Sequence, residues 1–305
     1  MSQIAESYLS TKVEDVAGKF NALPKTGCHE KLENLPYYSN IGVDHVQGYT
    51  QYQNGDNLYF IFTHSLDSRE SGRIVMIKNM KTLHKEIHTQ TDWNHPGGIQ
   101  AVGKYLFVPC EKAEKSIISV YDLDSSNLDK VKQIECSHKA GSLGITDFVI
   151  SSIPYYLLLV GASSTYHAYI SEIKSSAMAE QSFKKVGSFS LDNISGKKLD
   201  CQGFGLVTDT QNQVHMIALM PHASGATYAD WGYLIKINPT TSGVNYEYLG
   251  QNRHFTNKGG VSGTYGSHFR WGAGIRVTPD GRLVILATSR NIIAGTYLNT
   301  TSWYN

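Results

Sequence analysis

The chain has 305 residues, of which 41% are hydrophobic, and 27 basic side chains balance 26 acidic ones to leave a net charge of +1. This balance provides no basic surface for nucleic acid or for an anionic membrane, and we expect neither as a partner. Nineteen tyrosines and 28 glycines are typical of a β-rich protein, because aromatic rings suit pleated sheets and glycines suit tight turns.

The start of the chain shows no targeting segment. Residues Met1 to Tyr8 lack a basic stretch followed by an apolar one, so they do not form a signal peptide. No window approaches the ~18 apolar residues of a membrane helix. We therefore expect a cytoplasmic protein whose four cysteines are free thiols, the alternative being a secreted protein whose leader was removed.

A degenerate repeat begins at residue 48. In each copy a glycine opens a short strand, and a turn and a more apolar strand follow. The glycines are separated by 50, 46, 61 and 69 residues, close to the roughly 40–50 residues of propeller repeats. The five glycines are Gly48, Gly98, Gly144, Gly205 and Gly274.

Two more strands are predicted in each copy, but the last copy lacks sequence for its fourth strand. Only residues 295–304 remain for its third strand, so the fourth must come from the first 44 residues, around Val13 to Phe20 or somewhat later. The repeat resembles the β-propeller superfamily. The resemblance implies a single propeller domain over residues 1–305. Five blades are favoured over six, with a ring closed by the N-terminal and C-terminal strands.

The blade pattern places most histidines on one face of the ring. Strands alternate in direction, so the connections between blades and the loops after each second strand emerge together, on what we call the top face. Nine of the twelve histidines fall in these connections. They are His45, His64, His88, His95, His138, His167, His222, His254 and His268.

Two of these histidines are expected at the mouth of the central channel. His45 and His95 each lie three residues before a repeat glycine, on adjacent blades. They could act with His268 as general acids or bases. With His138 they could instead hold a divalent metal ion. A third possibility is that these imidazoles only bind backbone groups where the chain crosses between blades.

A long glycine-containing loop, residues 251–271, supplies candidate binding residues for the same face. Its aromatic and cationic side chains are suited to a sugar-like or aromatic ligand with a polar or anionic group. The predicted binding residues are Trp93, Arg253, Tyr265, Arg270, Trp271 and Arg276. Arg276 is expected to be the one charge that faces the channel, unless it pairs with Asp147 or Asp209.

The sequence does not specify the reaction. It contains no phosphate-binding loop, so no nucleotide cofactor is expected. We predict an enzyme with one asymmetric site on the top face, acting on a small organic substrate by lyase, isomerase, cyclase or hydrolase chemistry. A glycosidase pair of carboxylates could come from Asp44, Asp92, Glu111, Asp200 or Asp230. The alternative is a binding propeller such as a lectin, although the top-face residues differ from blade to blade.

Overall fold

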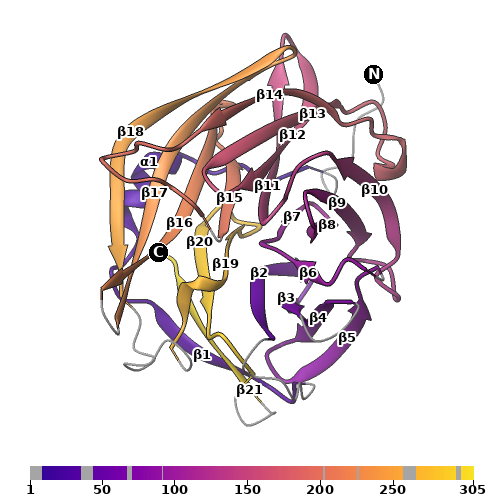
Figure 1. Ribbon diagram of the computed structural model, residues 1–305, viewed down its shortest axis with the longest axis vertical. Coiled ribbons are helices and arrows are strands. Elements are labelled where there is room, and N and C mark those ends of the chain that lie inside the picture. The colour runs from indigo at the N-terminus through magenta and orange to yellow at the C-terminus, as the bar shows by residue number, and fades with distance from the viewer. Residues whose placement is uncertain are drawn as a thin grey trace.

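The computed structural model describes residues 9–35, 44–66, 71–90, 92–201, 203–224, 227–256, 266–292 and 297–305. Its strands form four hydrogen-bonded sheets, and the eight-stranded one consists of two antiparallel four-stranded blades joined by a parallel bridge between Ala273 and Gly48. Five blades therefore surround a central axis, in the arrangement that Figure 1 shows. The prediction of an all-β, five-bladed propeller is therefore confirmed. That residues 1–305 form one domain stays a prediction.

Each blade has its innermost strand beside the axis. Blade 1 contains β2 (His45–Asn54), β3 (Asn57–Ser65), β4 (Arg73–Lys78) and β5 (Thr82–His88). Blade 2 contains β6 (His95–Pro96), β7 (Gln100–Val102), β8 (Tyr105–Lys112), β9 (Lys115–Asp122) and β10 (Lys130–Cys136). Blade 3 contains β11 (Ser142–Ile150), β12 (Ile153–Ala162), β13 (Thr165–Glu172) and β14 (Lys184–Ser190). Blade 4 contains β15 (Gly203–Thr208), β16 (Val214–Ser224), β17 (Thr227–Thr240) and β18 (Gly243–Phe255). Blade 5 contains β19 (His268–Val277), β20 (Leu283–Thr288), β21 (Tyr297–Trp303) and β1 (Cys28–Glu33).

The last blade joins both ends of the chain. Strand β1 pairs antiparallel with β21, and buried Leu32 lies opposite Leu298. The expected closing strand is therefore present, but later than residues 13–20. Those residues mostly form helix α1 (Val16–Ala22), because Asp15 accepts a hydrogen bond from the Gly18 amide and so caps its first turn.

The repeat glycines let neighbouring inner strands approach each other. A Cβ atom at Gly48 would lie 2.5 Å from the carbonyl oxygen of Gly97, on the next blade. A Cβ atom at Gly274 would lie 2.1 Å from the carbonyl oxygen of Tyr49. Both separations are shorter than a van der Waals contact, so only glycine fits there. These two repeat glycines therefore mark positions where neighbouring blades contact each other near the axis.

Apolar clusters between neighbouring blades hold this ring together. In one of them, Leu157 and Tyr166 of blade 3 pack with Phe204 and Met216 of blade 4. Such burial contributes roughly 25 cal/mol per Å² of apolar surface. The loops at either end of the channel are therefore carried by a packed frame. No helix in the described part of the chain is long and apolar enough to span a membrane.

A buried amide side chain also links three blades across the channel. Gln100 of β7 donates from Nε2 to the carbonyl oxygen of Leu206, at 2.8 Å. Its Oε1 accepts from the amides of Ile145, at 3.0 Å, and Leu206, at 2.9 Å. One side chain from blade 2 therefore binds backbone groups of blades 3 and 4.

Candidate functional site

The two predicted histidines at the channel mouth do lie together. The rings of His45 and His95 are edge to face, with centroids 6.2 Å apart. Nε2 of Gln47 lies 2.6 Å from Nε2 of His45 and 2.8 Å from Nε2 of His95. An amide nitrogen carries two protons, so it can donate to both rings. A ring that accepts this hydrogen bond at Nε2 has only Nδ1 left to carry a proton.

A carboxylate faces the other nitrogen of His95. Glu111 lies opposite His95 in the pairing of β6 with β8, and its Oε2 is 3.8 Å from His95 Nδ1. Nδ1 of His95 is buried and makes no hydrogen bond to any residue that the structure describes. A carboxylate at this separation stabilises the ring electrostatically when the ring becomes protonated. This pair can therefore accept a proton at Nε2 of His95.

An aromatic and cationic wall adjoins His45. The ring of Trp271 lies edge-on to His45, with centroids 5.9 Å apart. The guanidinium groups of Arg270 and Arg290 each lie 5.1 Å from the Trp271 ring, which gives two cation–π contacts. Of the predicted binding residues, Trp271 therefore lies beside His45 and Arg270 lies against Trp271, and their role in binding stays a prediction.

A pocket of about 660 Å³ opens from this mouth over blades 2 and 3. His95, Gln47 and three carboxylate residues, Glu111, Glu114 and Asp200, line it. Pockets of about 300–1,000 Å³ are typical of small-molecule sites. The arrangement combines a candidate base with acidic groups in a space that a small organic substrate can enter.

Two further histidines line the same pocket, and their rings stack against each other. The rings of His138 and His167 stack with centroids 3.7 Å apart. Nδ1 of His138 donates to the carbonyl oxygen of Lys139, and its Nε2 accepts from the Tyr169 hydroxyl, both at 2.8 Å. Burial lowers the pKa of His138, and burial together with His138 lowers the pKa of His167 to about 4. Both rings are therefore neutral at pH 7.

The predicted metal ligands His45, His95 and His138 do not form a common cluster. Within the described residues, no group of three or more His, Cys, Asp or Glu side chains is placed to hold a metal ion. Both nitrogens of His138 already have partners. The structure therefore gives the divalent metal ion no ligand set, and that ion stays a prediction.

Other predicted residues lie away from the mouth. Buried His268 has Nδ1 3.1 Å from Asp230, whose other oxygen accepts from the Phe269 amide, so this pair stabilises the start of β19. Trp93 lines a separate pocket of about 580 Å³ beside blade 2. Arg253 donates to the carbonyl oxygen of Asn21 and so binds β18 to the end of α1.

Arg276 faces the channel as expected, but at the end opposite the histidines. It donates to the Gln51 and Gln53 amide oxygens, at 3.1 and 2.6 Å. Among the described residues neither alternative partner pairs with Arg276, because Asp147 binds Lys12 at 2.6 Å and Asp209 accepts hydrogen bonds from the amides of residues 211 and 213. Tyr265 lies outside the described residues.

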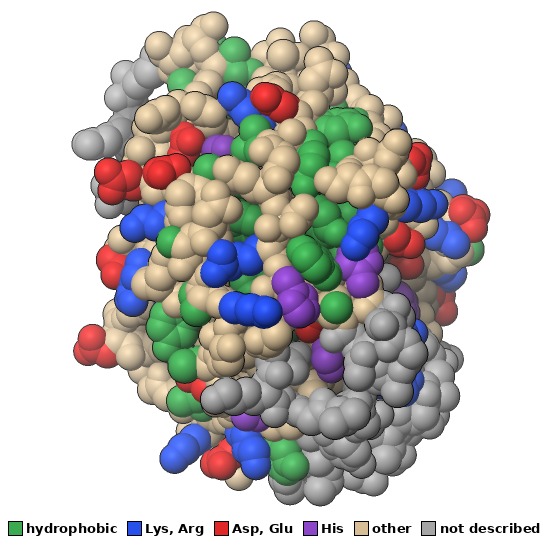
Figure 2. Space-filling view, turned by 90° about the vertical axis from the view of Figure 1, so that its left-hand side faces the viewer, with side chains coloured by type: hydrophobic (Ala, Val, Ile, Leu, Met, Phe, Trp, Pro, Cys, Tyr) green, Lys and Arg blue, Asp and Glu red, His purple; other side chains and the backbone are tan. Residues whose placement is uncertain are grey.

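Sequence reasoning missed Gln47 and assigned Glu111 no specific role. Gln47 lies two residues after His45, so alternation along a strand puts both side chains on one face. This spacing in the sequence was therefore enough to predict Gln47 as a neighbour of His45. The partnership of Glu111 with His95 depends on strand register, which the sequence pattern does not reveal. Figure 2 shows acidic and basic side chains mixed over one side of the ring, in line with the near-zero net charge.

No protein-family model and no curated protein sequence matches this chain. Solved structures match it in fold. An α-L-arabinofuranosidase from Podospora anserina, in complex with cellotriose, has a TM-score of 0.50 and 9% identity, over 93% of this chain and 98% of that chain. A GH62 hydrolase in complex with xylotriose has a TM-score of 0.51 and 7% identity, over 92% and 96%. The GH62 α-L-arabinofuranosidase catalytic domain from Coprinopsis cinerea has a TM-score of 0.50 and 9% identity, over 92% and 96%.

The shared architecture is the β-propeller. At 7–9% identity the likeness shows this fold alone. The propeller accounts for the position of the site, since ligands bind where loops from several blades meet at one end of the channel.

Proposed function

We propose that this protein is a hydrolase that acts on a sugar-like substrate in the pocket at the channel mouth. The observation that carries the proposal is the position of His95 on the wall of a 660 Å³ pocket, with Gln47 2.8 Å from its Nε2 and the Glu111 carboxylate 3.8 Å from its Nδ1. The matched propellers support the substrate class, because they include arabinofuranosidases and were solved with cellotriose or xylotriose. Lyase, isomerase and cyclase chemistry have no comparable support.

In this proposal His95 acts as the general base. A water molecule gives a proton to His95 Nε2, and its oxygen bonds to the anomeric carbon as the glycosidic C–O bond breaks. Glu111 stabilises the imidazolium through the proton on Nδ1. The leaving oxygen takes a proton from a carboxyl group of the same pocket, for which Glu114 and Asp200 are the candidates. Gln47 must release Nε2 first, and its amide is then available for a substrate hydroxyl.

One observation favours the alternative, a propeller that binds a sugar without cleaving it. In this structure Gln47 lies against Nε2 of both His45 and His95, at 2.6 and 2.8 Å. If that contact persists with ligand bound, neither imidazole can accept a proton from water.

A hydrolysis assay separates the two functions. The substrates are 4-nitrophenyl α-L-arabinofuranoside and β-D-xyloside, together with xylotriose and cellotriose, and products are measured by chromatography. For a substrate that is cleaved, we expect His95→Gln to lower kcat by about 10²-fold or more while binding remains. Glu111→Gln should lower kcat about tenfold or more without changing the fold, because it leaves the imidazolium without its opposing charge.

His84→Gln is the matched control, because His84 is an exposed residue of outer strand β5. It should leave kcat unchanged. Equal turnover by wild type and His95→Gln would refute the role of His95. Saturable binding of xylotriose without any product would instead establish the binding function.

A further inference from the structure

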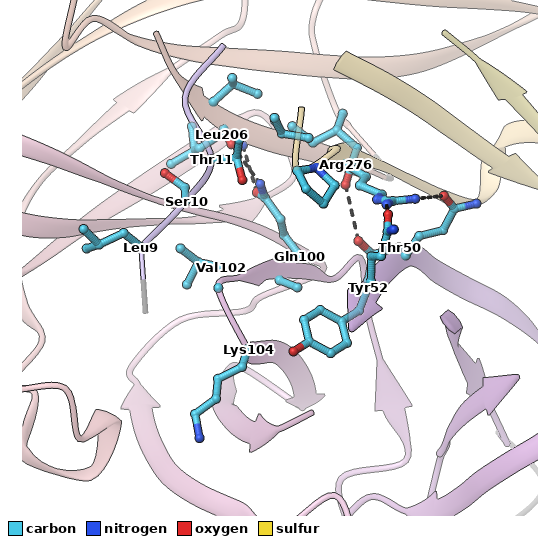
Figure 3. A pocket seen from close by; sticks show the side chains of 18 residues that line it. Leu9, Ser10, Thr11, Thr50, Tyr52, Gln100, Val102, Lys104, Leu206 and Arg276 are labelled. Carbon is cyan, nitrogen blue, oxygen red and sulfur yellow. Dashed lines mark hydrogen bonds between the residues drawn. The ribbon is translucent and has the colours of Figure 1, made fainter. Parts of the chain in front are cut away.

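A second pocket lies at the opposite end of the channel. It has a volume of about 260 Å³, and its walls are the ends of β2, β7, β15 and β19 together with residues 9–11 (Figure 3). His45 and Gln53 mark the two ends of β2, eight residues apart, which corresponds to roughly 26 Å of extended strand. The pocket is therefore distinct from the histidine site.

Arg276 projects into this pocket with its guanidinium group held in place. Figure 3 shows the side chain beside Thr50, with its hydrogen bond to a neighbouring amide. Both amide partners, Gln51 and Gln53, are neutral. No ion pair in the described part of the chain includes Arg276, and the nearby carboxylate of Asp280 binds Arg282 at 2.9 Å. Burial lowers the pKa of Arg276, which reflects the cost of keeping this cation away from water.

Beyond Arg276, the described walls hold no acid, and their other cation is already paired. Lys104 lines the pocket, with Nζ 2.7 Å from Asp122. Among the described lining residues there is no Asp or Glu. The charge of the lining is therefore positive, although the whole chain is close to neutral.

We propose that this pocket binds a compact oxyanion, the carboxylate or phosphate group of a small molecule, through the guanidinium of Arg276. A planar guanidinium matches the oxygens of these groups in a bidentate geometry. Two amide side chains already fix the orientation of the group, so little conformational freedom is lost on binding. The volume of about 260 Å³ restricts the ligand to a small molecule.

The N-terminal segment from Ser10 to Val13, which we call the strap, forms part of the wall. The Ser10 amide and Lys12 Nζ both bind the Asp147 carboxylate at 2.6 Å, and the Val13 amide donates to Thr208. A ligand in the pocket would contact the strap and hold it against the ring. Binding should therefore protect the strap from proteolysis.

Titration calorimetry with inorganic phosphate, acetate and citrate, at ionic strength matched with chloride, tests the proposal. We expect saturable binding of at least one probe, and the better probe distinguishes a phosphate ligand from a carboxylate ligand. Arg276→Gln should weaken binding at least tenfold, whereas Lys174→Gln, at an exposed position outside the pocket, should leave it unchanged. Absence of binding by every probe, or equal binding by Arg276→Gln, overturns the proposal.

Trypsin cleavage of the wild-type protein gives a second measurement that does not depend on a variant that folds. The rate of cleavage after Lys12 is followed by mass spectrometry, with cleavage after exposed Lys174 as the internal control. The bound probe should slow cleavage after Lys12 at least threefold and leave the control site unchanged. Equal effects at both sites would overturn the proposal. Neither measurement depends on the histidine site, so the hydrolase proposal stands or fails separately.

Discussion

Replacement of Gln100 by leucine tests whether one side chain stabilises the ring across three blades. Leucine has a similar size but cannot bind the amides of Ile145 and Leu206, which lie within 3.0 Å of Gln100 Oε1. A buried donor without a partner costs about 1–3 kcal/mol. The two amides together therefore predict a loss of about 2–6 kcal/mol in the free energy of unfolding.

Chemical denaturation monitored by tryptophan fluorescence measures this loss. Gln133→Leu is the matched control, because Gln133 is exposed on outer strand β10 and its contact with Lys130 is a surface one. That variant should change the free energy of unfolding by no more than about 0.5 kcal/mol. A loss below about 1 kcal/mol in Gln100→Leu, with an unchanged m value, would refute the reasoning and show that water replaces the amide.

Three further predictions concern the stability of the propeller. Gly274→Ala should destabilise the fold by about 2–3 kcal/mol in denaturant titration, because its methyl group would lie 2.1 Å from the Tyr49 carbonyl oxygen, and an unchanged midpoint would contradict this. The pKa of His167 is about 4 in the folded protein and near 6.5 in the unfolded chain. Between these values only the unfolded chain binds the proton, so the free energy of unfolding should fall as the pH drops from 6.5 to 4. The melting temperature of His167→Gln should fall less over that range, and parallel curves would exclude the effect. Leu32→Ala should lower the free energy of unfolding by about 2–5 kcal/mol. Leu83→Ala, at a side chain that is 40% exposed, should lower it by less than about 0.5 kcal/mol. Equal losses would mean that Leu32 of β1 stabilises the fold no more than a surface residue does.

The sequence pattern was sufficient to predict the propeller, because the repeat reflects a local steric requirement for glycine. Close approach of adjacent inner strands requires glycine at Gly48 and Gly274, and a Cβ atom at Gly144 or Gly205 would also lie no more than 3.0 Å from atoms of the next blade. The same intervals placed His45 and His95 at one end of the channel, where the structure brings them together. The closing strand lies after residues 13–20 but within the range that the sequence allowed, because the segment from Val13 to Phe20 mostly forms a short capped helix.

The rest of the site depends on information that a repeat does not carry. Glu111 reaches His95 through the register of β6 against β8, which involves residues sixteen positions apart. His268 falls in the predicted face but is buried against Asp230. Arg276 lies on an inner strand, and its distance from the repeat glycine puts it toward the far end. The spacing of residues along the sequence predicts which end of the channel a side chain lies at. The packing of the folded chain decides which residue that side chain contacts.

The pairing of β1 with β21 has a consequence for biosynthesis. Leu32 and its partner Leu298 are separated by about 270 residues. At a synthesis rate of about 5–20 residues per second, β1 waits about 13–53 s after its own translation before its partner exists. During that interval four blades can assemble, while the other three strands of the fifth blade, β19, β20 and β21, remain incomplete. Leu32, the one buried residue of β1, is then exposed to chaperones or to the unfinished edge of another nascent chain.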